Sequence, residues 1–332
     1  MLPMIPYFLL SLLLTFVLTA VILRFLIPYL KSRKMGQKIL DIGPRWHKSK
    51  EGTPTMGGLS FLVSILLLSA LLLTVAASNG TLDNLPLVVL TLLFAAANGL
   101  IGILDDRTKF SKGKNEGLLS WQKYLLQLTA SVLYLLAIHR FGYLSTDLVI
   151  PFLDLSLSLG WGYYPIAVLI LTGIINSVNL TDGIDGLAAS QTAIVGGFFA
   201  AVAFLVGSLS LGIVAGATVG GCLGFLVYNF YPARVFMGDT GSLFLGGLVV
   251  GMAFMANDPL VVFFVGLVYV LEAVSVILQV AYFKLTHGKR LFRMAPIHHH
   301  FEKCGWGEIR IVTVFAVITL LLTVLTFVFH SY

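Results

Sequence analysis

Long apolar runs, separated by shorter polar connections, dominate the hydrophobic pattern of the chain. A helix needs about 20 mainly apolar residues to cross the hydrocarbon core of a bilayer. The first run is too long for the core of a signal peptide and lacks a basic leading segment, so it is predicted to be retained. We therefore predict an all-α polytopic membrane protein, one domain over 1–332, with about ten transmembrane helices at 3–30, 55–77, 85–104, 121–139, 163–179, 189–207, 211–231, 241–257, 260–284 and 309–330.

The composition supports a membrane protein. Of the 332 residues, 58% are hydrophobic and only 11% are charged, whereas soluble domains have about 25% charged and 45–50% apolar residues. These values exclude a soluble enzyme, a nucleic-acid-binding protein and an intrinsically disordered chain. The two cysteines, Cys222 in an apolar run and Cys304 in a charged connection, do not suggest a disulfide framework.

Positive charges predict how the chain crosses the membrane. Connections rich in Lys and Arg stay in the cytoplasm. Nineteen of the 21 Lys and Arg residues lie in or beside one alternate set of connections, at 31–54, 105–120, 180–188, 232–240 and 285–308. This set is predicted to be cytoplasmic, with both termini outside. In the long outer connection at 140–162, the alternation of Leu148, Ile150, Phe152 and Leu153 near Pro151 suggests a short hairpin lying on the membrane.

Acidic residues gather on the same side. Topology requires Lys and Arg there but makes no demand for acids. We therefore expect an active site on the cytoplasmic face that uses carboxylates. Ten of the 15 acids lie there, namely Asp41, Glu51, Asp105, Asp106, Glu116, Asp182, Asp185, Asp239, Glu302 and Glu308.

Two acidic motifs follow apolar runs. Asp105 and Asp106 end the third run, where a helix dipole disfavours negative charge; they are either a hydrated pair or a site for metal coordination or proton transfer. Residues 179–187 read Asn-Leu-Thr-Asp-Gly-Ile-Asp-Gly-Leu. In a helical turn, Asp182 and Asp185 would share a face, and the glycines would let the backbone approach a ligand. A polar cap and turn is the alternative.

A third acidic motif precedes the eighth run. Asp239 is followed by Thr240, Gly241 and Ser242. A helix that begins here would offer free N–H groups to a phosphate. Asp239 would otherwise be the N-cap of that helix, and the two roles are compatible.

Three consecutive histidines, His298 to His300, lie in the last cytoplasmic connection. Imidazoles bind metals, but consecutive residues on one helix or strand do not all face one ion. We expect one or two of them to donate to phosphate, with a solvated loop as the alternative. Six lysines lie beside the carboxylates, namely Lys48, Lys50, Lys109, Lys112, Lys114 and Lys123. Lys is also expected here from topology and anionic lipids, so we expect only one or two of them to act in catalysis.

Glu272 is an acid inside the ninth apolar run. Acids at membrane depth are functional candidates. Glu272 would support ion transport, or it would hydrogen-bond a neighbouring helix.

Carboxylates from three connections, joined by Lys and His, suit magnesium-dependent phosphoryl transfer. Mg²⁺ binds through one or two carboxylates and fills its remaining positions with water and phosphate oxygens. The sequence has no Walker A motif and no Gly-x-Gly-x-x-Gly before a helix, which excludes an ATPase motor. At a membrane surface, one substrate is expected to be a lipid and the other a water-soluble phosphate compound.

Five stretches closely resemble the phospho-N-acetylmuramoyl-pentapeptide transferase family, a branch of the polyprenyl-phosphate N-acetylhexosamine-1-phosphate transferase superfamily. The histidine run favours the muramoyl-pentapeptide branch over the others. The stretches are Gly-Thr-Pro-Thr-Met-Gly-Gly (52–58), Leu-Asp-Asp-Arg (104–107), the 179–187 motif, Phe-Met-Gly-Asp-Thr-Gly-Ser (236–242) and Pro-Ile-His-His-His-Phe-Glu (296–302).

The resemblance implies a reaction and its partners. UDP-MurNAc-pentapeptide and undecaprenyl phosphate would give lipid I and UMP, with Mg²⁺ as cofactor, in peptidoglycan synthesis. The protein would be a multi-pass protein of the bacterial inner (cytoplasmic) membrane, in contact with membrane lipids, without a nucleic-acid partner, and a homodimer is possible.

The resemblance also implies roles for individual residues. Asp239 would bind Mg²⁺, Asp105 and Asp106 would lie beside the lipid phosphate, and His298 would contact phosphate or the sugar. Phe236 would stack on uracil. The remaining substrate-binding residues would be Lys50, Thr55, Lys109, Lys123, Asn179, Asp182, Asp185, Gly186, Leu187, Asn229, Gln279, His299 and His300.

The chemistry of the acceptor favours one-step transfer. A phosphate monoester has its second pKa near about 6, so a general base has little proton to remove at neutral pH. We therefore expect direct attack, helped by positioning and charge neutralisation, rather than a phospho-aspartate on Asp239 or Asp105. The alternatives are a sister transferase that uses UDP-GlcNAc, a transporter of ions or lipid-linked sugars, and a non-catalytic receptor.

Overall fold

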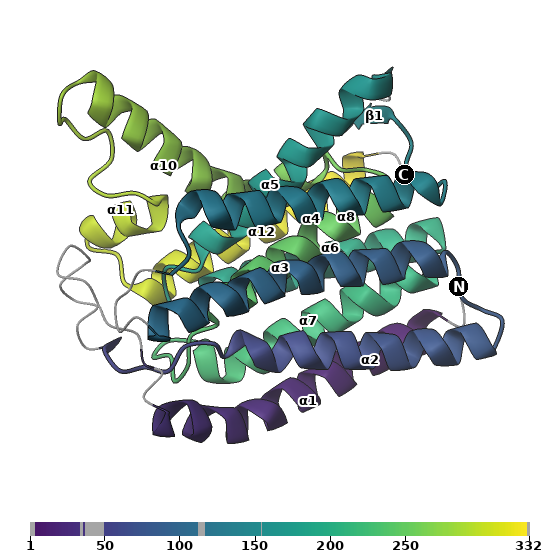
Figure 1. Cartoon of the computed structure of the whole chain (residues 1–332), viewed down its shortest axis with the longest axis horizontal. Coiled ribbons are helices and arrows are strands. Elements are labelled where there is room, and N and C mark those ends of the chain that lie inside the picture. Colours follow the sequence, from purple (N-terminus) through teal and green to yellow (C-terminus); the bar gives the residue numbers. More distant parts are fainter. Residues whose placement is uncertain (1–3, 34–35, 37–49, 112–116, 154, 331–332) are drawn as a thin grey trace.

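The structure is a computed structural model that describes residues 4–33, 36, 50–111, 117–153 and 155–330. Most of its helices run along the long direction of the molecule (Figure 1). The long helices are α1 (Met4–Ser32), α2 (Gly58–Ser78), α3 (Leu85–Ser111), α4 (Ser120–Arg140), α5 (Tyr163–Thr181), α6 (Leu187–Val206), α7 (Leu209–Asn229), α8 (Gly238–Met255), α10 (Leu267–Leu285) and α12 (Glu308–Phe329). Two shorter helices are α9 (Val262–Val265) and α11 (Ile297–Lys303).

Nine of the described helices are long and apolar enough to cross a membrane, which confirms an all-α polytopic membrane protein. They are α1, α2, α3, α5, α6, α7, α8, α10 and α12. The predicted run at 121–139 forms α4, but polar side chains near its ends, including Lys123, His139 and Arg140, lower its hydropathy. The run at 260–284 is divided at Gly266 into α9 and α10.

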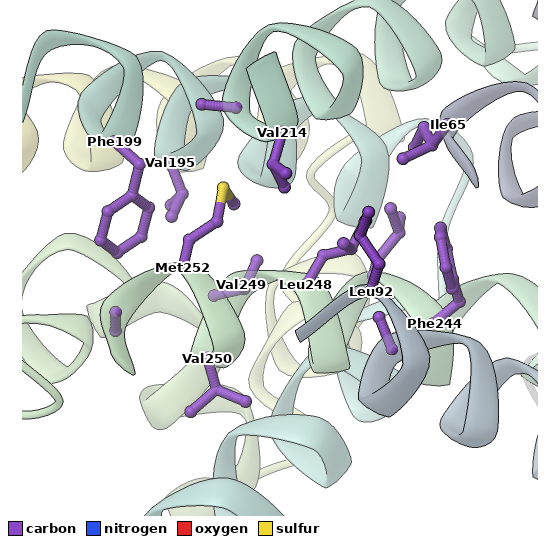
Figure 2. Close-up of a cluster of buried hydrophobic side chains, with 14 of the residues drawn as sticks. Ile65, Leu92, Val195, Phe199, Val214, Phe244, Leu248, Val249, Val250 and Met252 are labelled. Atoms are coloured by element: carbon purple, nitrogen blue, oxygen red, sulfur yellow. The ribbon is translucent and has the colours of Figure 1, made fainter. Parts of the chain in front are cut away.

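Helix α8 lies in the interior of the bundle. Of its apolar window, 83% is buried, as in α7, whereas the value for α10 is 22%, and α10 leans away from the other helices (Figure 1). Figure 2 shows part of the core, where side chains of α2, α3, α6, α7 and α8 meet, including Ile65, Leu92, Val195, Phe199, Val214, Phe244, Leu248, Val249, Val250 and Met252. This rigid centre carries the first turn of α8 and hence Asp239.

Glycines let α1 pack directly on α7. Gly216, Gly220 and Gly224 recur every four residues of α7 and face the backbone of α1. A Cβ atom on Gly220 would lie 2.1 Å from the carbonyl oxygen of Leu12. Small residues permit the close backbone approach that stabilises helix pairs in membranes.

The two ends of the molecule differ. Both termini lie at one end, near a hairpin of β1 (Asp147–Ile150) and β2 (Leu155–Ser158) (Figure 1), so the hairpin expected within 140–162 is confirmed. The opposite end holds the connections after α5 and α7 and before α2 and α12. Two of these connections pair, since Phe236 N–H donates to the Pro54 carbonyl and Gly57 N–H donates to the Phe236 carbonyl, both at 2.8 Å.

Candidate active site

Three carboxylates converge where α3 meets the start of α8. Oxygen atoms of Asp105, Asp106 and Asp239 all lie within 4.8 Å of one another, and this group is able to hold a metal ion. Gly102 makes the approach possible, because a Cβ atom there would lie 2.2 Å from the Asp239 carbonyl oxygen. The Asp-Asp pair is therefore part of an acidic cluster and does not merely end a span.

Asp106 binds the first turn of α8. Its carboxylate accepts from the Thr240 hydroxyl (2.7 Å), from Thr240 N–H (3.0 Å) and from Asp239 N–H (3.3 Å). Helix N-termini carry unpaired N–H groups and partial positive charge, and both favour an anion at this place. Gly238 has φ 71°, and its Cβ atom would lie 2.6 Å from Asp106 Oδ2. Asp106 thus caps a helix from a neighbouring element.

This capping changes the expectation for Asp239. The N-cap position of α8 is Met237, so the interpretation of Asp239 as N-cap is wrong. The N–H groups of Asp239 and Thr240, which were expected to be free for a phosphate, donate to Asp106. The reason is a contact between α3 and α8 that local sequence does not encode.

Two lysines and an amide hold the Asp239 carboxylate. Its Oδ2 lies 2.8 Å from Lys109 Nζ and 2.9 Å from Lys123 Nζ, and its Oδ1 accepts from Asn179 Nδ2 at 2.9 Å. Lys109 also contacts Asp105 at 2.7 Å. Three carboxylates face two ammonium groups, so the cluster keeps an excess of negative charge. Carboxylate oxygens in this arrangement suit a hard divalent cation.

Asp182 and Asp185 lie in the turn between α5 and α6. Residues 182–186 form turns and a bend rather than a helix, so the helical face that Asp182 and Asp185 would share is not formed. Burial, followed by the negative charges of Asp239 and Asp106, raises the pKa of Asp182 well above its usual range. Asp185 contacts Lys50 at 2.7 Å and accepts from Ala233 N–H at 2.9 Å.

Glu308 joins this second group of charges. Its Oε2 lies 2.6 Å from Lys50 Nζ and accepts from Asp185 N–H at 3.0 Å. Sequence reasoning placed Glu308 among the cytoplasmic acids but not in the site. Its position before the last apolar run was the available signal, but its partners are 123 and 258 residues away along the chain.

Asn229 links the turn before α6 to the connection after α7 by hydrogen bonds. Its side chain accepts from Gly186 N–H (3.0 Å) and donates to the Val235 carbonyl (2.9 Å), and it is 3% exposed. Gly186 has φ 78° at the start of α6. Leu187 is fully buried in a side cluster with Ile311. These residues shape the chain beside Asp185.

Thr55 and Phe236 remain partly accessible. Both side chains are half-buried, and the Thr55 hydroxyl would be 2.8 Å from a Cβ atom on Gly238. Phe236 lies on the connection that pairs with the 54–57 segment. Both are therefore beside the start of α8.

The histidines lie on α11 and have three different partners, as expected for consecutive residues. His298 Nδ1 is 2.9 Å from Glu272 Oε2, and His299 Nδ1 is 2.5 Å from Glu302 Oε2. His300 Nδ1 accepts from Arg293 N–H at 3.1 Å. His298 is fully buried, whereas the other two are half-buried.

Gln279 braces the connection before α11. Its carbonyl oxygen accepts from the N–H groups of Leu291 (3.1 Å) and Phe292 (2.8 Å). The structure does not place Gln279 in contact with the acidic cluster.

A cavity of about 520 Å³ opens beside the acidic cluster. Its polar lining residues are Asp105, Lys109, Ser120, Lys123, Asn176 and Asp239. Its other lining residues are Gly117, Leu118, Leu119 and Tyr124. A cavity lined by both charged and apolar residues fits an amphiphilic phosphate compound.

Comparisons with known proteins identify the chain. A family model described as glycosyl transferase family 4 matches residues 87–257, which include the acidic cluster. A signature described as phospho-N-acetylmuramoyl-pentapeptide-transferase signature 1 matches residues 50–62, which include Lys50 and Thr55.

Similar proteins that carry the name phospho-N-acetylmuramoyl-pentapeptide-transferase match nearly the whole chain. The one from Halalkalibacterium halodurans is 45% identical over 317 residues, 96% of this chain and 95% of that protein. One from Clostridium botulinum is 46% identical over 325 residues, covering 97% and 96%. One from Clostridioides difficile is 44% identical over 311 residues, covering 93% and 94%. This multi-pass membrane enzyme belongs to the phospho-N-acetylmuramoyl-pentapeptide-transferase family.

Proposed function

We propose that the protein transfers phospho-MurNAc-pentapeptide from UDP-MurNAc-pentapeptide to undecaprenyl phosphate, giving lipid I and UMP. The observation that supports this most is the cluster of Asp105, Asp106 and Asp239, of which Asp105 and Asp239 line the cavity together with Lys109 and Lys123. Its excess negative charge suits a cation, and its lysines suit phosphate groups. The names of the relatives support the choice of donor sugar.

Mg²⁺ is the proposed cofactor. Asp239 and Asp105 would hold it, because both line the cavity, whereas Asp106 binds the first turn of α8 and is not among the lining residues. When bound, Mg²⁺ would neutralise charge on the pyrophosphate. The chain's own part is to keep these carboxylates together through the close approach of α3 to α8.

The cavity is the proposed place of the lipid phosphate. Lys109 and Lys123 line the cavity and would bind its oxygens, and the lining residues Leu118, Leu119 and Tyr124 suit the first part of the prenyl chain. A phosphate oxygen attacks the phosphorus attached to the sugar, and the bond from that phosphorus to the bridging oxygen breaks. The bond electrons leave with UMP. Because the acceptor is mostly dianionic at neutral pH, positioning contributes more than proton removal.

We propose that the nucleotide of the donor binds beside the second group of charges. Lys50, Asp185 and Glu308 connect the segment before α2, the turn before α6 and the start of α12. Phe236 would stack on uracil, with Thr55 next to it. The remaining proposed substrate-binding residues are Asn179, Asp182, Gly186, Leu187, Asn229, Gln279, His299 and His300; Asn229 and Gln279 would act by holding connections in place. His298, whose side chain is fully buried, would act through the turn that it packs against.

We propose the bacterial cytoplasmic membrane as the location, with the acidic cluster in the cytoplasm and both termini outside. The support is the Lys and Arg distribution and the position of both termini at the end opposite the site (Figure 1). A single domain over 1–332 and a homodimer are further proposals that purification and mass measurement in detergent can test.

The donor is tested by UMP release. Purified protein receives undecaprenyl phosphate with either UDP-MurNAc-pentapeptide or UDP-GlcNAc, with and without Mg²⁺. We expect Mg²⁺-dependent UMP from the muramoyl donor alone. UMP from UDP-GlcNAc would indicate the sister activity, and no UMP from either donor would contradict the proposal.

One-step transfer is tested by omitting the acceptor. Protein incubated with donor labelled in the sugar phosphate should carry no protein-bound label. A stoichiometric adduct on Asp239 or Asp105 would show a two-step reaction instead.

A further inference from the structure

Glu272 and His298 form a buried pair that links α10 to α11. Both side chains are fully buried. Glu272 Oε2 lies 2.9 Å from His298 Nδ1 and 3.4 Å from His298 N. The acid at membrane depth, for which ion transport was one interpretation, thus has an imidazole as its direct partner.

Pairing with a carboxylate assigns a tautomer to the imidazole. An ionised Glu272 has no hydrogen to donate to Nδ1, so the hydrogen bond between them requires a proton on Nδ1. A carboxylate only accepts hydrogen bonds. Nε2 is therefore the nitrogen that points away from Glu272.

His298 Nε2 faces the turn that carries Asp182. A Cβ atom on Gly183 would lie 2.2 Å from Nε2, so only glycine fits at this position. Within the described residues, Nε2 has no hydrogen-bond partner. The imidazole is held on one side by α10 and packs on the other against the residue next to Asp182.

We infer that Glu272 is a positioning residue that acts through His298 and the Gly183 backbone to place the Asp182 turn beside the acidic cluster. This inference rests on the proposed function. Asp185, at the other side of the turn, is held independently by Lys50 and Glu308. Loss of Glu272 should therefore lower turnover more than nucleotide binding.

The kinetic test compares Glu272→Gln, His298→Gln and the double variant, with UMP release as readout. We expect Glu272→Gln to lower kcat about tenfold or more, with KM for the nucleotide sugar within about twofold of wild type. In the His298→Gln background, Glu272→Gln should change kcat by less than about twofold, because both act through one imidazole. Gly183→Ala should lower kcat in the same way, since its methyl group displaces the ring.

Asp258→Asn is the matched control. Asp258 is a buried carboxylate paired with His330 at 2.6 Å, and His330 follows the end of α12, the helix that Glu308 begins. Its loss should leave kcat unchanged. A normal kcat for Glu272→Gln, or effects of Glu272→Gln and His298→Gln that multiply, would overturn the inference.

A second readout needs no catalysis, so it separates failure of the inference from failure of the proposed function. In ¹⁵N-histidine-labelled protein, the His298 signal is identified by its loss in His298→Gln. We expect it to show protonated Nδ1 in wild type and to change in Glu272→Gln but not in Asp258→Asn. A wild-type signal with the proton on Nε2 alone would overturn the inference, whether or not UMP is released.

Discussion

At the residue scale, three neighbouring acids have three different environments. Asp106 accepts hydrogen bonds from the N-terminus of α8. Asp105 pairs with Lys109 and accepts from the Leu118 N–H group. Asp239 pairs with two lysines and accepts from the Asn179 side chain. The Asp-Asp motif was visible in the sequence. The difference between its two members was not, because the partners of Asp106 lie 133 and 134 residues away along the chain.

Asp239→Asn tests the proposed metal site. The amide keeps the size of the side chain but removes charge where Asp239 faces Lys109 and Lys123. We expect UMP release to fall roughly 100- to 1,000-fold, while the thermal unfolding midpoint stays close to that of wild type. Asp147→Asn, an exposed acid in the hairpin, is the control. Near-normal turnover of Asp239→Asn would show that this carboxylate does not hold the metal.

Asp106→Asn should act mainly on stability. An amide has one oxygen to replace the two that accept from Asp239 and Thr240, and its NH₂ group faces N–H donors at a positive helix end. We expect a loss of about 1–2 kcal/mol, as for a removed N-cap, seen as a lower unfolding midpoint in detergent. An unchanged midpoint would contradict the capping role.

Asp182 should make stability depend on pH. Its raised pKa means that the folded protein binds the proton more tightly than the unfolded chain does. Stability therefore falls as pH rises from the ordinary carboxyl pKa of about 4 through the raised value, and is constant above it. Asp182→Asn removes this loss.

The measurement is thermal unfolding of wild type and Asp182→Asn from about pH 5 to about pH 9. The variant should be the more stable protein at the alkaline end, and the difference should shrink toward the acidic end. If Asp182→Asn were less stable than wild type at alkaline pH, burial and the neighbouring negative charges would not disfavour the ionised Asp182 carboxylate.

At the scale of helices, hydrophobic runs predicted most of the fold because the bilayer sets their length. The break at Gly266 lay within one continuous apolar run, and nothing in its hydropathy marked it. The hydrogen bonds by which Asn229 and Gln279 hold their connections, and the ion pair of Glu308 with Lys50, also could not be predicted from the sequence. Each depends on which connections meet at the end of the bundle, which periodicity does not encode.

The glycine stripe of α7 gives a prediction for helix packing. Gly220→Ala places a methyl group 2.1 Å from the Leu12 carbonyl oxygen, so α1 must shift. We expect a loss of about 1–3 kcal/mol, as for other overpacked sites, and a lower unfolding midpoint. Gly197→Ala on α6 has nothing within 4 Å of the new Cβ atom and should not lower it. Equal midpoints for both variants would contradict direct packing of α1 on α7.

At the scale of the whole molecule, the charged site lies at one end of a bundle whose long helices expose apolar side chains. The acidic cluster lies on α3 and α8, which belong to the packed interior, so its carboxylates are held by packed helices rather than by the connections alone. The cavity beside them is lined by both charged and apolar residues. This arrangement supports the transfer of a charged sugar phosphate to a lipid at the membrane surface.

The most direct test follows the sugar into lipid. Purified protein in detergent receives undecaprenyl phosphate, Mg²⁺ and UDP-MurNAc-pentapeptide labelled in the sugar, and the solvent-extractable lipid and UMP are both quantified. We expect label to enter the lipid fraction in equal amount to UMP, only with Mg²⁺, and not with Asp239→Asn. Label that remains water-soluble, or lipid labelling that survives in Asp239→Asn, would contradict transfer at the acidic cluster.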